Sequence, residues 1–118
     1  MIKILLILTV LIPTVSFAAH LHKEKVYQDV WCDSAGGIKE FRLSDGTRVD
    51  CVTDNYSIEF DFAPHWAESV GQALYYAERT GKQPGVVLIM ENEGDERYLD
   101  RLNVLATKYN IQVWSIAP

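Results

Sequence analysis

Residues 48–76 limit most narrowly what this chain can fold into. They begin with RVDCV, pass through a polar turn, continue as the alternating YSIEFDF, and end in a long segment whose apolar residues recur every three or four positions. Alternation with a period of two predicts a strand, whereas recurrence at three and four predicts one face of a helix. Pro64, at the junction, is a residue that helices accept in their first turn. The stretch therefore predicts two strands followed by a helix.

Acidic side chains gather on these two predicted strands. In 56–62, strand alternation puts Glu59 and Asp61 on one face, about 7 Å apart, opposite three apolar residues. If 47–53 pairs with that strand, Asp50 lies across from them. We therefore expect three carboxyl groups to converge.

The rest of the chain surrounds this stretch with further elements. Turn residues and periodicity predict helices at 23–34, 64–80 and 95–109, and additional strands at 38–43, 86–90 and 111–116. Gly81 is expected to end the second helix, and Asn110 to end the third in the left-handed conformation. A meander of three strands followed by strand–helix–strand units predicts an α/β (α+β) domain, with a mixed sheet flanked by helices.

The same periodicities predict which faces are buried. The first helix is expected to bury four apolar residues, Val26, Tyr27, Val30 and Trp31. In strand 47–53, Val49 and Cys51 are expected to share the face opposite Asp50. Strand 86–90 is apolar throughout, which predicts a central strand covered on both sides.

Several polar groups have a plain interpretation beside a functional one. His20 and His22, in the polar segment 20–25, are either solvated or weak ligands for copper or nickel. His65 is either an exposed first-turn residue or a base or ligand near the acids. The acidic run 91–96 is expected to be a solvated loop and helix start.

The first eighteen residues are typical of a secretory signal peptide. Lys3 gives a basic start, residues 4–15 form an apolar run broken by Pro13, and residues 16–18 are suited to a cleavage site. The alternative is an uncleaved anchor, although the run is short for a span. We expect cleavage after residue 18, a single domain at 19–118 without a membrane span, and export to the periplasm or beyond the cell.

Cys32 and Cys51 are the two cysteines of the chain. In an exported protein such a pair predicts a disulfide, which here would close a loop of about 18 residues and contribute about 3 kcal/mol. The alternative is two small buried apolar residues. No further cysteine or histidine stands at zinc-finger spacing, which argues against structural zinc.

The charge of the chain bears on its partners. The net charge is −5, and loss of Lys3 with the signal peptide takes it to −6. An acidic surface repels polyphosphates, so the usual electrostatic signature of a nucleic-acid partner is missing. Metal ions or a local basic patch would have to offset that repulsion.

The three carboxyl groups have two interpretations. Neighbouring carboxylates repel one another unless water, a cation or raised pKa values relieve the repulsion. Oxygen-rich clusters suit Mg²⁺ or Mn²⁺, which polarise a phosphodiester and lower the pKa of an attacking water. Alternatively, these acids form the solvated face of a half-exposed sheet, with Arg48 and Lys39 as cross-strand partners.

The order of elements and acids resembles the PD-(D/E)XK nuclease superfamily, which has the restriction-endonuclease-like fold. The motif of that family is an acid on the second strand and Glu-x-Lys on the third. Asp50 matches the first position and Glu59, in IEFD, matches the second. Gln72-Ala-Leu-Tyr-Tyr76 resembles the Gln-x-x-x-Tyr of the branch related to bacterial recombination exonucleases. Glu24 corresponds to an additional acid on the first helix, and the resemblance covers nearly all of 19–118.

Asp61 departs from this pattern, because the family has a lysine there. A carboxylate cannot stabilise developing negative charge without a metal. Either a basic residue elsewhere substitutes, with Lys39, Arg48 and Lys82 as candidates, or Asp61 is a third metal ligand, or the site has lost catalysis. The family is also mostly intracellular, whereas this chain is expected to be exported.

Two functions follow as hypotheses. The first is a nuclease that depends on Mg²⁺ or Mn²⁺, with Asp50, Glu59 and Asp61 as ligands and catalytic residues, Gln72 positioning substrate or water, and Tyr76 beside it. The second is a non-catalytic exported domain on a degenerate nuclease fold, which binds a protein or another ligand.

Overall fold

The computed structural model describes residues 9–12 and 19–118, so most of the predicted signal peptide lies outside the described residues. Along the described chain the elements are α1 (Glu24–Ser34), β1 (Ile38–Arg42), β2 (Arg48–Val52), β3 (Tyr56–Phe62), η1 (Ala63–His65), α2 (Trp66–Thr80), β4 (Gln83–Ile89), η2 (Glu93–Asp95), α3 (Glu96–Tyr109) and β5 (Gln112–Ile116). Within these ranges, no helix has the length and apolar character needed to cross a membrane.

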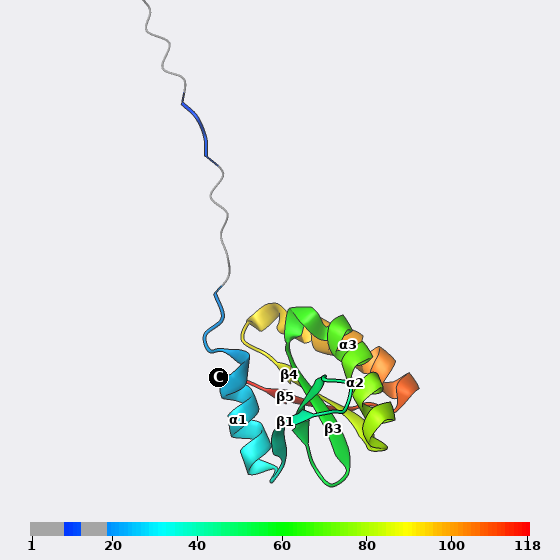
Figure 1. Cartoon of the computed structure of the whole chain (residues 1–118). Coiled ribbons are helices and arrows are strands. Elements are labelled where there is room, and N and C mark those ends of the chain that lie inside the picture. Colours follow the sequence, from blue (N-terminus) through cyan, green and yellow to red (C-terminus); the bar gives the residue numbers. More distant parts are fainter. Residues whose placement is uncertain (1–8, 13–18) are drawn as a thin grey trace, which may run out of the picture.

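The strands form one mixed sheet in the order β1-β2-β3-β4-β5. Short turns make β1, β2 and β3 antiparallel, while α2 and α3 act as crossovers that make β3, β4 and β5 parallel. Helix α1 packs on one face of the sheet, and α2 and α3 lie together on the other (Figure 1). The prediction of an α+β domain with a mixed sheet and flanking helices is confirmed.

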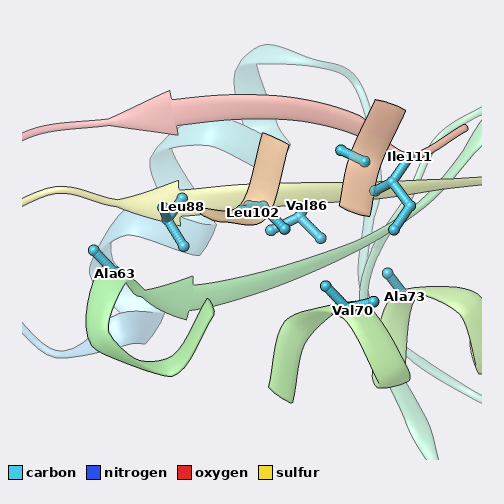
Figure 2. Close-up of a cluster of buried hydrophobic side chains, with 8 residues drawn as sticks. Ala63, Val70, Ala73, Val86, Leu88, Leu102 and Ile111 are labelled. Carbon is cyan, nitrogen blue, oxygen red and sulfur yellow. The ribbon is translucent and has the colours of Figure 1, made fainter. Parts of the chain in front are cut away.

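The larger core lies between the sheet and helices α2 and α3. Figure 2 shows Val86 and Leu88 of β4 facing Val70 and Ala73 of α2, with Leu102 of α3 beside them. The neighbours of these residues along β4 pack instead against the α1 side. Strand β4 therefore lies inside the sheet, between β3 and β5, and is covered on both faces as its apolar sequence predicts. Gly81 and Asn110 end α2 and α3 with positive φ angles of 71° and 56°, also as predicted.

The predicted disulfide is present and joins α1 to β2. Cys32 and Cys51 are 2.04 Å apart at sulfur and 6.0 Å apart at Cα, and both are fully buried. A Cβ atom on Gly37 would lie 2.5 Å from the sulfur of Cys51 and 2.7 Å from that of Cys32. Only glycine therefore allows the chain to pass so close to the bridge on its way from α1 into β1.

The predicted buried face of α1 is partly wrong. Val26 and Val30 are exposed, at 47% and 63%, while Gln28 is buried beside Cys32. The disulfide fixes Cys32 toward the sheet, and the amide of Gln28 is satisfied there because it donates a hydrogen bond to the backbone oxygen of Asp50 over 2.8 Å. These two contacts, made far along the chain, rotate the helix away from its most apolar stripe.

The predicted sharing of one face by Val49 and Cys51 is also wrong. Cys51 packs on the α1 side of the sheet, whereas Val49 packs against Tyr76 of α2. Regular alternation fails between them, at Asp50, where strand β2 leaves its partner β3. Two of the acids singled out from the sequence, Asp50 and Glu59, meet at this point.

Candidate functional site

Strands β2 and β3 separate after two residue pairs, and side chains bridge the gap that opens. Their paired residues are Cys51 with Ile58 and Val52 with Ser57. Farther along, Oδ2 of Asp50 accepts a hydrogen bond from the backbone N–H of Phe60 at 2.9 Å. The backbone N–H of Asp50 donates to Oε1 of Glu59 at 3.2 Å. The two acids therefore take the place of the backbone ladder and face each other between the strands.

Glu59 is the most deeply buried acid of this group. Its exposed fraction is 4%. Burial, followed by the charge of Asp50, raises the pKa of Glu59 to about 10. Burial also raises the pKa of Asp50, although the hydrogen bond from Phe60 opposes the rise. The pair therefore holds a proton at neutral pH, mainly on Glu59.

Asp61 lies on the same side of β3 as Glu59, and one of its carboxylate oxygens lacks a hydrogen-bond partner. In the part of the chain that the structure describes, its Oδ2 is the one buried side-chain nitrogen or oxygen atom without a hydrogen-bond partner. Burial, followed by the charges of Asp50 and Glu68, raises its pKa to about 7. An unpaired buried carboxylate oxygen is a costly feature, and a cation is the partner that best relieves it.

The first helix contributes a fourth acid, Glu24, at its first residue. Burial, followed by the charges of Asp50, Asp61 and Glu40, raises the pKa of Glu24 to about 7. The helix acid suggested by the family resemblance is therefore within electrostatic reach of two of the predicted acids. We refer to Glu24, Asp50, Glu59 and Asp61 as the acidic cluster.

Gln28 and Glu40 support the cluster and were not singled out from the sequence. Nε2 of Gln28 donates to the backbone oxygen of Asp50 at 2.8 Å and to Oε1 of Glu40 at 3.1 Å. Glu40 has a positive φ of 53°, and it is skipped in the otherwise continuous pairing of β1 with β2. Its sequence signal was the break that Glu40 makes in the alternation of strand 38–43. Gln28 carried no signal, because a glutamine on a helix is usually solvated.

Of the three basic candidates, Arg48 is placed nearest to the cluster. Its Nη1 lies 3.7 Å from Oε2 of Glu40, and its charge lowers the pKa of Asp50. Lys39 instead forms ion pairs with Asp33 at 2.9 Å and with Asp29 at 3.4 Å. Lys82 donates to the backbone oxygen of Asp54 at 2.8 Å, in the turn between β2 and β3.

The remaining predicted groups come from η1 and α2. Tyr76 is buried against Val49, and its pKa is raised by burial, followed by the charges of Glu59 and Asp50. Gln72, one turn earlier, is exposed on α2. His65 of η1 is exposed beside Glu68, and its charge opposes the rise in the pKa values of Glu24 and Asp61.

The interpretation of 91–96 as a solvated run is wrong for two of its acids. Asp95 is buried, and its Oδ2 accepts the backbone N–H groups of Glu91 and Asn92. The side chain of Glu91 is buried as well and binds the segment before α1. Asp95 thus satisfies backbone donors just after β4, whereas Glu91 satisfies those of Leu21 and His22 before α1.

The cluster offers hard oxygen donors, and these are the ligands that Mg²⁺ and Mn²⁺ prefer. Among residues 9–12 and 19–118, no three His, Cys, Asp or Glu side chains are already grouped tightly enough to hold a metal ion. Binding one would require the carboxyl groups to move closer together and Glu59 to lose its proton. No protein-family model, curated protein or solved structure matches this chain significantly.

Proposed function

We propose that the protein is a nuclease-like hydrolase that cleaves phosphodiester bonds with the help of Mg²⁺ or Mn²⁺. One observation carries the proposal. Acids from α1, β2 and β3 converge where β2 and β3 separate, and Oδ2 of Asp61 is buried there without a partner. A cluster of this kind is strained by its own charge and gains most from a bound cation.

Asp50, Glu59 and Asp61 would hold the ion, with Glu24 at the edge of the site. When bound, the ion would supply a Lewis acid for the phosphoryl oxygen and a more acidic water. This assignment follows the resemblance to the PD-(D/E)XK superfamily, with Asp61 as a ligand in place of the lysine.

Arg48 takes the position of a supporting cation in this proposal. Its guanidinium already lies near Glu40 and Asp50, whereas Lys39 and Lys82 are engaged elsewhere. A guanidinium presents several donors in a fixed plane and suits a phosphate oxygen. Arg48 would bind the phosphodiester and offset part of the repulsion from an acidic chain.

Gln72 and Tyr76 have different roles here. The exposed amide of Gln72 is free to position substrate or water. The buried ring of Tyr76 packs on Val49 and holds β2 against α2 near Glu59 and Asp50. Tyr76 would therefore shape the site from behind.

A second function is favoured by the protonated state of Glu59. A carboxyl group whose pKa is about 10 is neutral at pH 7, and the motif lysine is absent. Both features suit an exported, non-catalytic domain on a degenerate nuclease fold, which binds a protein or another ligand. In either case we propose export, because the buried disulfide fits an oxidising compartment.

A cleavage panel distinguishes the two functions. Full-length protein, expressed with its N-terminal segment, would be tested on single- and double-stranded DNA and RNA with Mn²⁺ or with chelator. Cleavage that requires Mn²⁺ and is abolished in Glu59→Ala supports the hydrolase. The matched control is Glu78→Ala, because Glu78 is an exposed acid on α2. Equal activity in chelator, or in Glu59→Ala, would overturn the proposal.

A further inference from the structure

Glu91 is a buried carboxylate that the proposed chemistry does not use. Its side chain is 4% exposed and lies just after β4. It accepts four hydrogen bonds: from Nδ1 of His20 at 2.7 Å, the N–H of Leu21 at 3.0 Å, the N–H of His22 at 3.3 Å and the hydroxyl of Tyr27 at 2.6 Å. All four donors come from the segment before α1 or from its first turns.

These contacts keep Glu91 charged in spite of its burial. Burial raises the pKa of Glu91, but the bonds from Tyr27 and His20, with the backbone N–H groups, outweigh it and leave the pKa below the ordinary value. The hydrogen bond also helps to raise the pKa of Tyr27 to about 12, after burial. A buried charge with four donors is a strong local anchor.

The same segment touches β3 directly beside the acidic cluster. The ring of His20 stacks on Phe62, with centroids 3.4 Å apart and planes within 9°. Tyr27 meets the edge of the same phenyl ring at 6.2 Å. Phe62 follows Asp61 on β3, and residues 20–22 run into Glu24. Glu91 therefore ties the start of α1 to the end of β4, and His20 and Tyr27 extend this contact to the end of β3.

We propose that Glu91 is a positioning residue, which holds Glu24 in place beside Asp61. We call Glu91 and its four donors the Glu91 clamp. The inference rests on the proposed function for the role of Asp61 as a cation ligand and for the place of Glu24 at the edge of that site. The placement of Glu24 by the clamp is a separate claim and can be tested without a metal. Through this placement, the segment that follows the predicted cleavage site becomes part of the site.

The test uses full-length protein and compares Glu91→Ala with Glu93→Ala, an exposed acid two residues away. Amide hydrogen exchange at Leu21 and His22 reports whether the clamp is open. The imidazole C–H chemical shifts of His65 report the position of Glu24, because His65 acts electrostatically on both Glu24 and Asp61. Calorimetry with Mn²⁺ reports the effect on the proposed site.

In Glu91→Ala we expect loss of protection at Leu21 and His22, and His65 shifts that move as they do in Glu24→Gln. The Kd for Mn²⁺ should rise about ten-fold, the usual effect of removing a group that orients ligands. Glu91→Gln keeps an acceptor oxygen and should restore part of each signal. Glu93→Ala should behave as wild type.

If Glu91→Ala loses amide protection at Leu21 and His22 while the His65 shifts stay unchanged, the Glu91 clamp does not position Glu24. If wild type binds no Mn²⁺ while the His65 shifts still respond, the proposed cation site fails and the positioning claim stands. Should Glu91→Ala not fold, His20→Ala replaces it, since the half-exposed ring of His20 can be removed with less damage. Amide exchange at Leu21 and His22, together with the His65 shifts, then tests the positioning claim in that variant.

Discussion

The backbone N–H of Asp50 donates a hydrogen bond to Oε1 of Glu59 across the opening between β2 and β3, at 3.2 Å. A sheet normally fills such a position with a backbone carbonyl. Here a carboxyl group does so, and the reciprocal bond from Phe60 to Asp50 fixes the second acid. The distortion of the sheet and the gathering of acids are therefore one feature.

Stability should fall as the pH rises through neutrality. Asp61 has a pKa of about 7 in the native state against 3.8 in a model peptide, and Glu24 about 7 against 4.5. Between about pH 4 and pH 7, Asp61 and Glu24 are protonated in the native state but ionised in the unfolded chain. Their contribution to the free energy of unfolding is therefore complete below about pH 4 and is lost as the pH rises through 7. Urea denaturation should show a lower free energy of unfolding at pH 8 than at pH 5, by about 2 kcal/mol once both contributions are reduced for the partial exposure of Glu24 and Asp61 to solvent.

Asp61→Asn removes one of these groups and should flatten that pH dependence. The variant should be more stable than wild type at pH 8, because no charge is then buried at this position. Asp100→Asn, on the exposed face of α3, serves as the control and should keep the wild-type slope. Identical slopes for wild type and Asp61→Asn would show that Asp61 is an ordinary solvated acid.

The disulfide should depend on Gly37. Reduction of Cys32–Cys51 should cost about 3 kcal/mol of stability. Gly37→Ala would drive a methyl group against both sulfur atoms and should lower the free energy of unfolding by about 2 kcal/mol. Gly71→Ala, in the exposed interior of α2 with nothing within 4 Å, should instead stabilise by about 1 kcal/mol. A neutral Gly37→Ala in thermal denaturation would contradict the close approach.

Arg48 and Lys39 should differ in their effect on cleavage. Arg48→Met should reduce Mn²⁺-dependent cleavage about a hundred-fold, as expected when a group that stabilises developing charge is lost. Lys39→Met should leave it nearly unchanged, since Lys39 is paired with Asp29 and Asp33. Single-turnover rates separate this effect from substrate binding. The reverse order of effects would assign the supporting cation to Lys39.

Features that depend on local pattern could be predicted from the sequence. The apolar run 86–90 predicted the central strand, Gly81 and Asn110 predicted the helix ends, and the cysteine pair predicted the disulfide. Strand alternation also put Glu59 and Asp61 on one side of β3, but Asp50 faces Glu59 where that alternation breaks and β2 leaves β3. Apart from the disulfide, which follows from a pair of cysteines in a chain expected to be exported, these properties are fixed within a few residues of the chain.

What could not be predicted depends on contacts between distant residues. Gln28 is buried because it reaches Asp50, 22 positions away, and Glu91 is buried because it binds residues 64 to 71 positions earlier. Composition marks both as solvated, and only tertiary hydrogen bonds reverse that expectation. Glu40 was partly predictable from the sequence. Its break in the strand pattern was visible, but its positive φ angle was not.

Calorimetric titration with Mn²⁺ at pH 8 tests the central claim most directly. Binding of Mn²⁺ should be saturable and should release close to one proton per ion, because the ion displaces the proton of Glu59. The release is measured as a dependence of the binding heat on the buffer. Glu59→Gln should abolish binding and proton release, while Glu78→Gln should bind as wild type does. Wild-type protein that takes up no Mn²⁺, or Glu59→Gln that binds it unchanged, would contradict the acidic cluster as a cation site.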